Sequence, residues 1–382
     1  MKIKNRIYSL LLVFVMAVTT TVSVPASQEV SSSPSNGRVE ELKELISMLS
    51  EDRQIIIGRS VDFSIYENLY LHPHFEETMI DARFALLREF NDILMEAVNI
   101  QSMSRGVAND SVVISLFAQP NEIGDAFTIG FTDVTYFTLI DAIVEFTGIE
   151  EDMLEIAIYE PFNFFPIGQP VDVDLNVGSF DANHEGIEPT AIMSLPMGTR
   201  LLHRHPNCTI FREFGTLGHP ANAGGARAFG TNHGVVPIGS TVYNSLRLRI
   251  GTVVNASFSP NAGQDVSLIQ FAHTHSVHLG IPGASQFLTT FFANPTSTQN
   301  IVTMHVARGN LSGTIRHLSA DVPFPGMTFR NVILASMIPQ AQDSGAALTS
   351  VSGGHGRAYG TLIGGNATQS IFGRATSYQH IR

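Results

Sequence analysis

Residues 341–348 read Ala-Gln-Asp-Ser-Gly-Ala-Ala-Leu, and the rest of the chain is organised around the serine at position 344. A hydroxyl between an acidic residue and a glycine, followed by small and apolar residues, predicts a tight turn that leads into a buried strand and exposes the Ser344 Oγ. Such turns are common in loops, so the tripeptide alone is weak support for catalysis. A serine hydroxyl is a poor nucleophile at neutral pH, and it needs a base, usually a histidine oriented by a carboxylate.

Two upstream stretches supply a base and a carboxylate. Residues 228–236 read Ala-Phe-Gly-Thr-Asn-His-Gly-Val-Val, which predicts an apolar strand running into a turn that carries His233. Residues 263–270 read Gly-Gln-Asp-Val-Ser-Leu-Ile-Gln, which predicts a polar turn that delivers Asp265 at the start of a buried strand. The order along the chain is therefore His, Asp, Ser.

That order is the one found in chymotrypsin. Three further segments resemble the first barrel of secreted bacterial chymotrypsin-like serine proteases of the streptogrisin and α-lytic type. They are Ile-Gly-Ser-Thr-Val-Tyr at 238–243, Ile-Gly-Thr-Val-Val at 250–254 and Asp-Val-Ser-Leu-Ile at 265–269. The resemblance extends over about residues 195–382. It implies an all-β, chymotrypsin-like double β-barrel, with barrels at about 195–280 and 285–371.

The resemblance also implies a secreted serine endopeptidase that needs no cofactor or metal. Ser344 would attack a peptide carbonyl and form an acyl-enzyme, His233 would take and return the proton, and Asp265 would orient the imidazole. The backbone N–H groups of Gln342 and Ser344 would form the oxyanion hole. By the same resemblance, Asp343 turns inward after activation and shapes the turn.

Two positions depart from the family pattern. Gln342 stands where the family usually has glycine, and a side chain there would tilt the peptide away from the developing charge. Loss of one oxyanion donor costs on the order of 10²–10³ in rate. Ile363 stands where relatives place a serine, which removes a hydroxyl from the surroundings of the aspartate. A catalytically weakened or inactive protease-like binding protein therefore stays open as an alternative, and a β-rich adhesion or scaffold protein with a chance triad is a third.

The expected substrate-binding residues lie on both sides of the serine turn. Ile338 and Pro339 precede Ser344 by six and five residues, and they resemble an S1 pocket wall without a carboxylate at its base. By resemblance, the strand carrying Ile363, Gly364 and Gly365 pairs with the substrate. We expect apolar or medium-sized P1 residues, and a peptide cleavage screen with a strict Arg or Lys preference would contradict this expectation.

His219 is a rival to His233 as the base. The segment Thr-Leu-Gly-His at 216–219 resembles the family's Thr-Ala-Gly-His more closely than the setting of His233 does. We favour His233 because the segments that should follow the catalytic histidine follow it directly.

The remaining histidines form two small groups. His273, His275 and His278 make a His-x-His-x-x-His pattern, and alternation along a strand puts the first two on one face, as a zinc site would need. No acidic residue or cysteine accompanies them. Solvent-exposed polar positions explain them equally well, and they also explain His203 and His205.

Cys208 is the only cysteine, which excludes an intramolecular disulfide. It precedes the histidine in a predicted strand, so it is not expected to be the nucleophile. The fold must then rest on barrel packing, for which two barrels bury enough apolar surface.

Residues 1–26 predict a secretory signal peptide. Lys2, Lys4 and Arg6 precede an apolar run at 7–18, and Val-Pro-Ala at 24–26 places small residues at a cleavage site. The apolar run is short for a membrane span, and no later segment is long and apolar enough to serve as an anchor. We therefore expect a secreted protein without a stable membrane anchor.

Charge divides the remaining chain in two. Residues 27–190 contain 30 Asp and Glu against 7 Lys and Arg, a formal charge of −23, and residues 191–382 contain 4 against 12, or +8. Opposite charges favour docking at low ionic strength. We therefore interpret 27–190 as an acidic pro-region of a zymogen, with its processing zone at 172–189, and 191–382 as the protease domain. A permanently attached accessory domain is the alternative.

Hydrophobic spacing predicts an α+β pro-domain followed by an all-β domain. Helices are expected at 39–49, 79–98 and 136–147, with strands at 112–117, 126–131 and 154–159. In the second domain, strands are expected at 198–202, 208–215, 227–231, 286–292, 300–308, 311–318, 326–336, 345–352 and 357–363.

The expected partners are protein or peptide substrates and the chain's own pro-region. The arginines of the second domain are dispersed without interleaved aromatic residues, so nucleic acid is not an expected partner. We expect a monomer.

Overall fold

The computed structural model describes residues 34–49, 79, 82–90, 92, 114–118, 127–131, 140–164, 193–205, 210–221, 226–233, 236–272, 275–278, 286–298, 300–324, 327–352 and 355–381. The chain forms two compact units, Met1–Tyr159 and Glu160–Arg382. The signal peptide, the processing zone at 172–189, Cys208 and His273 lie outside the described residues. The boundary expected near residue 190 lies outside them too, so these expectations stay predictions.

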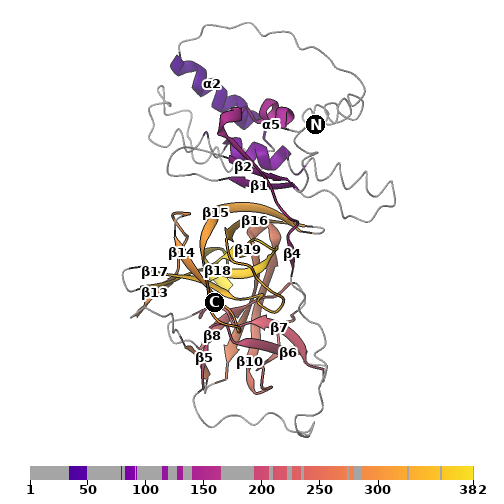
Figure 1. Cartoon of the computed structure of the whole chain (residues 1–382), viewed down its shortest axis with the longest axis vertical. Helices are drawn as coiled ribbons and strands as arrows, with labels where there is room; N and C mark the ends of the chain where they lie inside the picture. Colours follow the sequence, from indigo (N-terminus) through magenta and orange to yellow (C-terminus); the bar gives the residue numbers. More distant parts are fainter. Residues whose placement is uncertain are drawn as a thin grey trace, which may run out of the picture. The chain divides into compact units, whose positions relative to one another are not determined.

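The first unit combines helices and strands, as its hydrophobic spacing predicts (Figure 1). Its described elements are α2 (Pro34–Ser47), helical residues at 79, 82–90 and 92, β1 (Ile114–Ala118), β2 (Phe127–Phe131), α5 (Ile140–Thr147), the 3₁₀ turn η3 (Glu151–Met153) and β3 (Leu154–Ile158). β2 pairs antiparallel with β1 and parallel with β3, because α5 carries the chain back between β2 and β3. Phe127, Ile129 and Phe131 are buried against Leu87 and Ile143. Among the described residues, no helix has the length and apolar character to cross a membrane.

The first barrel of the second unit is closed by residues just after β7. Gly218 N donates to Phe229 O at 2.8 Å, and Phe229 N donates to His219 O at 3.0 Å. The strands pair antiparallel in the order β7-β6-β9-β10-β11-β8. They are β6 (Arg200–Arg204), β7 (Arg212–Thr216), β8 (Arg227–Gly230), β9 (Thr241–Asn244), β10 (Arg249–Ser259) and β11 (Gln264–Phe271). A separate parallel pair joins β5 (Met193–Pro196) to β12 (His275–His278).

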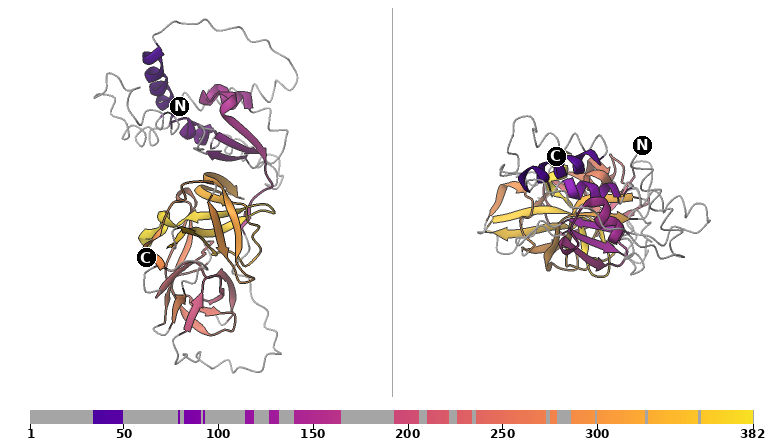
Figure 2. Two further views of the ribbon diagram at one scale, coloured as in Figure 1. Left: turned by 60° about the vertical axis from the view of Figure 1, so that its left-hand side comes forward. Right: turned by 90° about the horizontal axis from the view of Figure 1, so that it is seen from above.

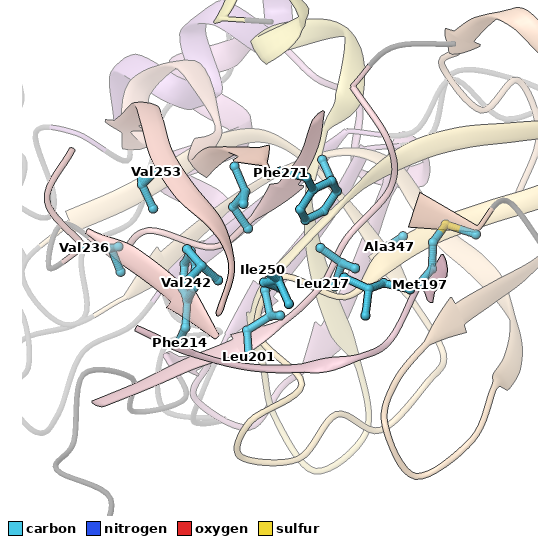
Figure 3. Packing of buried hydrophobic residues seen from close by; sticks show 13 residues of the cluster. Met197, Leu201, Phe214, Leu217, Val236, Val242, Ile250, Val253, Phe271 and Ala347 are labelled. Atoms are coloured by element: carbon cyan, nitrogen blue, oxygen red, sulfur yellow. The ribbon is translucent and has the colours of Figure 1, made fainter. Parts of the chain in front are cut away.

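The core of this barrel is apolar because alternate side chains of its strands point inward. Figure 3 shows Leu201, Phe214, Val242 and Ile250 among the packed side chains. Ala347, which comes from the second barrel, joins the same cluster. The two barrels therefore share a continuous buried layer.

The second barrel is a closed ring. Its strands pair in the order β14-β17-β18-β19-β16-β15, and β15 pairs again with β14. They are β14 (Ile301–His305), β15 (Leu311–Phe324), β16 (Met327–Ala335), β17 (Ala347–Ser352), β18 (His355–Gly365) and β19 (Ser370–Arg374), with β13 (Gln286–Phe292) parallel to β18. In Figure 1 these strands run from orange to yellow. The predicted double β-barrel is confirmed, with strand ends shifted by a few residues.

Several short elements near the C-terminal end of the second unit were not predicted from the sequence. β19 continues past Ile371, where the second barrel was expected to end, and α6 (Ala375–Tyr378) and the 3₁₀ turn η5 (Gln379–Ile381) follow it. Tyr378 packs with Phe229 and Leu268 of the first barrel. In Figure 2 the yellow α6 lies where the strands of the two barrels meet. A four-residue helix has too few residues for a hydrophobic period, so its position depends on these distant contacts.

Candidate active site

His233 and Asp265 meet because β8 and β11 are antiparallel neighbours. Gly230, the last residue of β8, pairs with Ser267 of β11. The chain therefore leaves β8 beside the start of β11, where Asp265 lies. His233 turns the chain there with a φ of 46°, in the left-handed region.

The Asp265 carboxylate is fully buried and fully hydrogen-bonded. Oδ1 accepts from the backbone N–H of Asn232 at 3.1 Å and from that of His233. Oδ2 accepts from the Thr231 hydroxyl at 3.2 Å and contacts His233 Nδ1. Buried charges are tolerated when their lone pairs have such partners. The carboxylate thereby sets the orientation of the imidazole and leaves Nε2 directed away from it.

Thr231 supplies a hydroxyl next to the aspartate, where the family pattern predicted that one would be missing. Ile363 replaces a serine in the family pattern, and it is buried and apolar. The Thr231 Oγ1, just after β8, lies 3.2 Å from His233 Nδ1 and donates to the aspartate at 3.2 Å. Thr231 stands in the Thr-Asn-His turn of the sequence, and its position two residues before the histidine is the signal that could have found it.

Ser344 lies in the turn between β16 and β17, with its Oγ 3.1 Å from His233 Nε2. Thr216 N of the first barrel donates to Ser344 O at 2.7 Å, and Gly345 N donates to Leu362 O of β18 at 2.9 Å. At Gly215, which has a φ of 107°, an added Cβ would lie 2.3 Å from Ser344 O. The serine turn is thus clamped between the two barrels, and glycine is needed where β7 approaches it.

The exposure expected for Ser344 is wrong, because the residue has 0 % of its surface exposed. The expectation assumed a turn that projects into solvent. The turn instead lies between β7 and β18, to which its backbone is hydrogen-bonded.

Gln342 adopts the backbone conformation that glycine would take at this position. Its φ is 81°, which costs a residue with a Cβ about 1–2 kcal/mol. The Thr216 hydroxyl donates to Gln342 O at 2.7 Å and holds this conformation. Within the described residues, the N–H groups of Gln342 and Ser344 have no acceptor. Both are therefore able to donate to a developing oxyanion.

Asp343 is turned inward in this structure of the whole chain. Its Oδ2 accepts from Arg308 at 3.0 Å and from Gln340 N at 2.8 Å, and its side chain is 6 % exposed. Arg308, in the turn after β14, also donates to Ile338 O at 3.0 Å. The Arg308 guanidinium thus links Asp343 to Ile338 and holds the segment that precedes Ser344.

The expected substrate-binding residues lie together beside this turn. An added Cβ at Gly365 would lie 2.6 Å from Pro339 Cγ, so the proline ring packs against the end of β18. Ile338 is more than half exposed. β4 (Asn163–Phe164) pairs antiparallel with Gly364 and Gly365.

His219 is fully buried, and both its ring nitrogens are engaged away from Ser344. Nδ1 donates to Pro220 O at 3.0 Å, and Nε2 accepts from the Tyr378 hydroxyl at 3.0 Å. The Thr361 hydroxyl lies 2.6 Å from the same Tyr378 oxygen. Burial lowers the pKa of His219 to about 4, so the ring is neutral at pH 7. The geometry assigns His219 to packing of α6 and places His233 beside the serine.

His203 is also buried, which corrects its expected exposure. It packs edge-on against Phe214, and its nitrogens have no hydrogen-bond partner among the described residues. His203 shares a strand face with the buried Leu201, so alternation along β6 places it inside. His275 and His278 lie in β12. The described residues contain no group of three or more side chains able to hold a metal ion.

Comparison with known proteins finds similarity in solved structures. No family model matches the sequence, and no curated protein matches it. A chymotrypsin from Cellulomonas bogoriensis is 17% identical with a TM-score of 0.35, over 48% of this chain and 92% of that one. Protease A of Thermobifida fusca is 16% identical with a TM-score of 0.35, over 48% and 92%. A protease from M. tuberculosis in its active form is 19% identical with a TM-score of 0.34, over 59% and 92%.

These neighbours are bacterial serine proteases, and the likeness to them is one of fold. Because identities are below 20% and TM-scores are below 0.5, we take the function of this chain from the geometry around Ser344.

Proposed function

We propose that the chain is a serine endopeptidase whose nucleophile is Ser344. One observation carries the proposal. The Ser344 Oγ lies 3.1 Å from His233 Nε2, while Nδ1 of the same ring contacts the buried Asp265 carboxylate. A nucleophile, a base and a group that orients the base are within hydrogen-bond reach, which is the geometry that activates a serine.

In the proposed reaction, the Ser344 Oγ forms a bond to the carbonyl carbon of a peptide while its proton passes to His233 Nε2. The carbonyl oxygen becomes an anion, and the N–H groups of Gln342 and Ser344 donate to it. When the intermediate collapses, the C–N bond breaks and His233 gives its proton to the leaving amine. A water molecule then attacks the acyl-enzyme while His233 takes its proton. The bond between the acyl carbon and Ser344 Oγ breaks, His233 returns the proton to Oγ, and the acid is released. Asp265 keeps the imidazole in the required tautomer throughout.

The finer features of the proposal concern specificity and activation. The P1 residues are apolar or medium-sized rather than Arg or Lys, and the apolar Pro339 ring packed beside Gly365 supports this preference. We further propose that the protein is secreted as a zymogen, in which residues 27–190 are the pro-region.

Mass spectrometry of the secreted product tests the zymogen proposal. We expect an active species that begins within or near 172–189, accompanied by a separate acidic fragment. A full-length active species that begins near Ser27 would show instead that the acidic half is a permanent domain.

Labelling with a fluorophosphonate tests the proposed chemistry directly. We expect a single adduct that peptide mapping places on Ser344, because only an activated serine reacts with this probe. Ser344→Ala and His233→Ala should abolish labelling, and His219→Ala should retain it in protein that remains folded.

The outcomes separate the enzyme from its alternative. Labelling that survives in Ser344→Ala, or that is lost in a folded His219→Ala variant, contradicts the assigned residues. If correctly processed protein does not react at all, the chain is a protease-like binding protein.

A further inference from the structure

Two aromatic rings and two arginines form a cluster on the outer face of the first barrel. Val242 of β9 points into the barrel core (Figure 3), so the neighbouring Tyr243 points outward. The Phe211 ring packs edge-on against Tyr243, with 4.9 Å between the ring centroids. The Arg204 guanidinium carbon lies 5.6 Å from the Tyr243 centroid and 6.0 Å from the Phe211 centroid. The Arg247 guanidinium carbon lies 5.4 Å from the same Phe211 centroid, so one pair of rings holds both cations in place.

The positive charge of this cluster is not neutralised within the second unit. Arg249 adds to it, because it pairs with Tyr243 in the sheet and its exposed side chain therefore shares that face. Among the described residues, no carboxylate forms an ion pair with Arg204, Arg247 or Arg249. Residues 191–382 contain four acidic residues, and each has another partner: Glu213 with Arg200, Asp265 with His233, Asp321 with Arg330 and Asp343 with Arg308.

Two large aliphatic side chains accompany the arginines and are exposed. Leu246 is 76 % exposed, and Ile210, which directly precedes the aromatic ring of the cluster, is 48 % exposed. Leu246 stands before Arg247 in the turn between β9 and β10. Asn244 Oδ1 fixes this turn by accepting from the backbone N–H groups of Leu246 and Leu248, both at 3.0 Å. The turn therefore presents an aliphatic side chain and a cation next to each other on an ordered backbone.

The cluster lies at the end of β7 that is remote from Ser344. The last residue of β7, Thr216, donates its N–H to Ser344 O at 2.7 Å. Phe211 precedes Thr216 by five residues, which is about 16 Å along an extended strand. A partner that covers the cluster can therefore leave the serine turn uncovered.

We propose that this docking surface binds reversibly to an anionic lipid membrane. It consists of Ile210, Phe211 and the turn residue Leu246, together with Arg204, Arg247 and Arg249. Guanidinium groups without carboxylate partners complement lipid phosphates, which they bind through two parallel hydrogen bonds. Exposed aliphatic side chains enter the boundary between headgroups and acyl chains, and aromatic rings lie at the headgroup level.

The exposed aliphatic side chains favour a membrane over a soluble anion. An acidic peptide or a free phosphate would satisfy the arginines, but it would leave the 76 % exposed Leu246 in water. A lipid surface satisfies both features at once. This docking is peripheral, because it uses a strand face and a turn and needs no membrane-spanning segment.

Flotation with lipid vesicles tests the proposal on the full chain, with Ser344→Ala present to prevent self-cleavage. We expect the protein to float at low ionic strength with vesicles made of equal parts phosphatidylglycerol and phosphatidylcholine, and not with phosphatidylcholine alone. Each arginine at an anionic surface contributes about fivefold to the partition coefficient, so Arg204→Gln, Arg247→Gln should lower it about 25-fold. Leu246→Ser should lower it about tenfold, because it removes the inserted side chain.

A matched control separates this surface from a general effect of charge. Arg316→Gln, Arg357→Gln removes the same charge from the second barrel and should keep the partition coefficient within about twofold. The acidic first unit is common to all variants, so ratios between variants are compared. Urea unfolding checks that each variant is folded, and Leu246 is exposed enough that its substitution leaves packing intact.

Three outcomes would overturn the proposal. The first is a chain that does not float with anionic vesicles, and the second is an equal loss in the Arg316, Arg357 control, which would indicate a diffuse charge effect. The third is a partition coefficient that depends on the two arginines but not on Leu246, which would show a site for a soluble anion. None of these measurements depends on turnover, so each result holds whether or not Ser344 is a nucleophile.

Discussion

Replacement of Asp265 by asparagine is expected to lower kcat about 10⁴-fold, with the fold retained. Both carboxylate oxygens act as acceptors in the structure. Oδ1 accepts from the backbone N–H groups of Asn232 and His233, so an amide would place its oxygen there and its NH₂ group toward His233 Nδ1. Nδ1 would then have to accept, which leaves the proton on Nε2. A protonated Nε2 cannot take the proton of Ser344.

Steady-state hydrolysis of a peptide anilide by the processed protein measures this effect, and urea unfolding of the same samples checks the fold. Thr231→Val is the matched comparison, because it removes only the hydroxyl that donates to the same carboxylate. One lost hydrogen bond to a charged group is worth about 1.5–3 kcal/mol, so we expect a decrease of about 10- to 100-fold in kcat. An Asp265→Asn enzyme within tenfold of the unsubstituted protein would mean that the carboxylate does not set the tautomer.

Most barrel strands, and the proximity of His233 to Asp265, could be predicted from the sequence. His233 and Asp265 each stand at the end of an apolar run, and antiparallel pairing of these runs brings their ends together. Patterns of this kind are local, so a single sequence reveals them. The closed second barrel also followed from local signals, because its strands are long and bounded by Gly, Pro and Asn.

Features that depend on contacts between distant segments could not be predicted. β4 is two residues long, and its partner lies about 200 residues downstream, so no period marks it. The burial of Ser344 follows from hydrogen bonds to β7 and β18, which the turn sequence does not encode. The left-handed φ of Gln342 likewise reflects the Thr216 hydroxyl that holds its carbonyl. The sequence shows that Gln342 replaces the glycine of the family pattern. It does not show that Gln342 keeps the left-handed backbone conformation of that glycine.

Acid is expected to unfold the second unit steeply between pH 6.5 and 4. Among its described residues, four histidines are buried, and burial is the main cause that lowers each pKa from 6.5 to about 4; they are His203, His219, His305 and His317. Because the folded pKa is depressed, the unfolded chain binds more protons throughout this window. The contribution of the neutral rings to stability is therefore complete above pH 6.5 and is lost as the pH falls toward 4. Each histidine changes the free energy of unfolding by up to about 1.4 kcal/mol per pH unit. The four together therefore give a slope of about 5 kcal/mol per pH unit.

Urea unfolding followed by far-UV circular dichroism at pH 7, 6 and 5 measures this slope. The variants His203→Leu and His219→Leu test whether individual histidines cause the slope. Each removes one group that is protonated only on unfolding, so each should lower the slope by the contribution of about one proton, or about 1.4 kcal/mol per pH unit. At pH 7 their effects should differ. His203 has no hydrogen-bond partner among the described residues, so leucine should cost little there, whereas His219→Leu takes a buried acceptor from the Tyr378 hydroxyl and should cost about 1–3 kcal/mol. A free energy of unfolding that stays constant between pH 6 and 5 would mean that these rings are protonated, or accessible to water, in the folded protein.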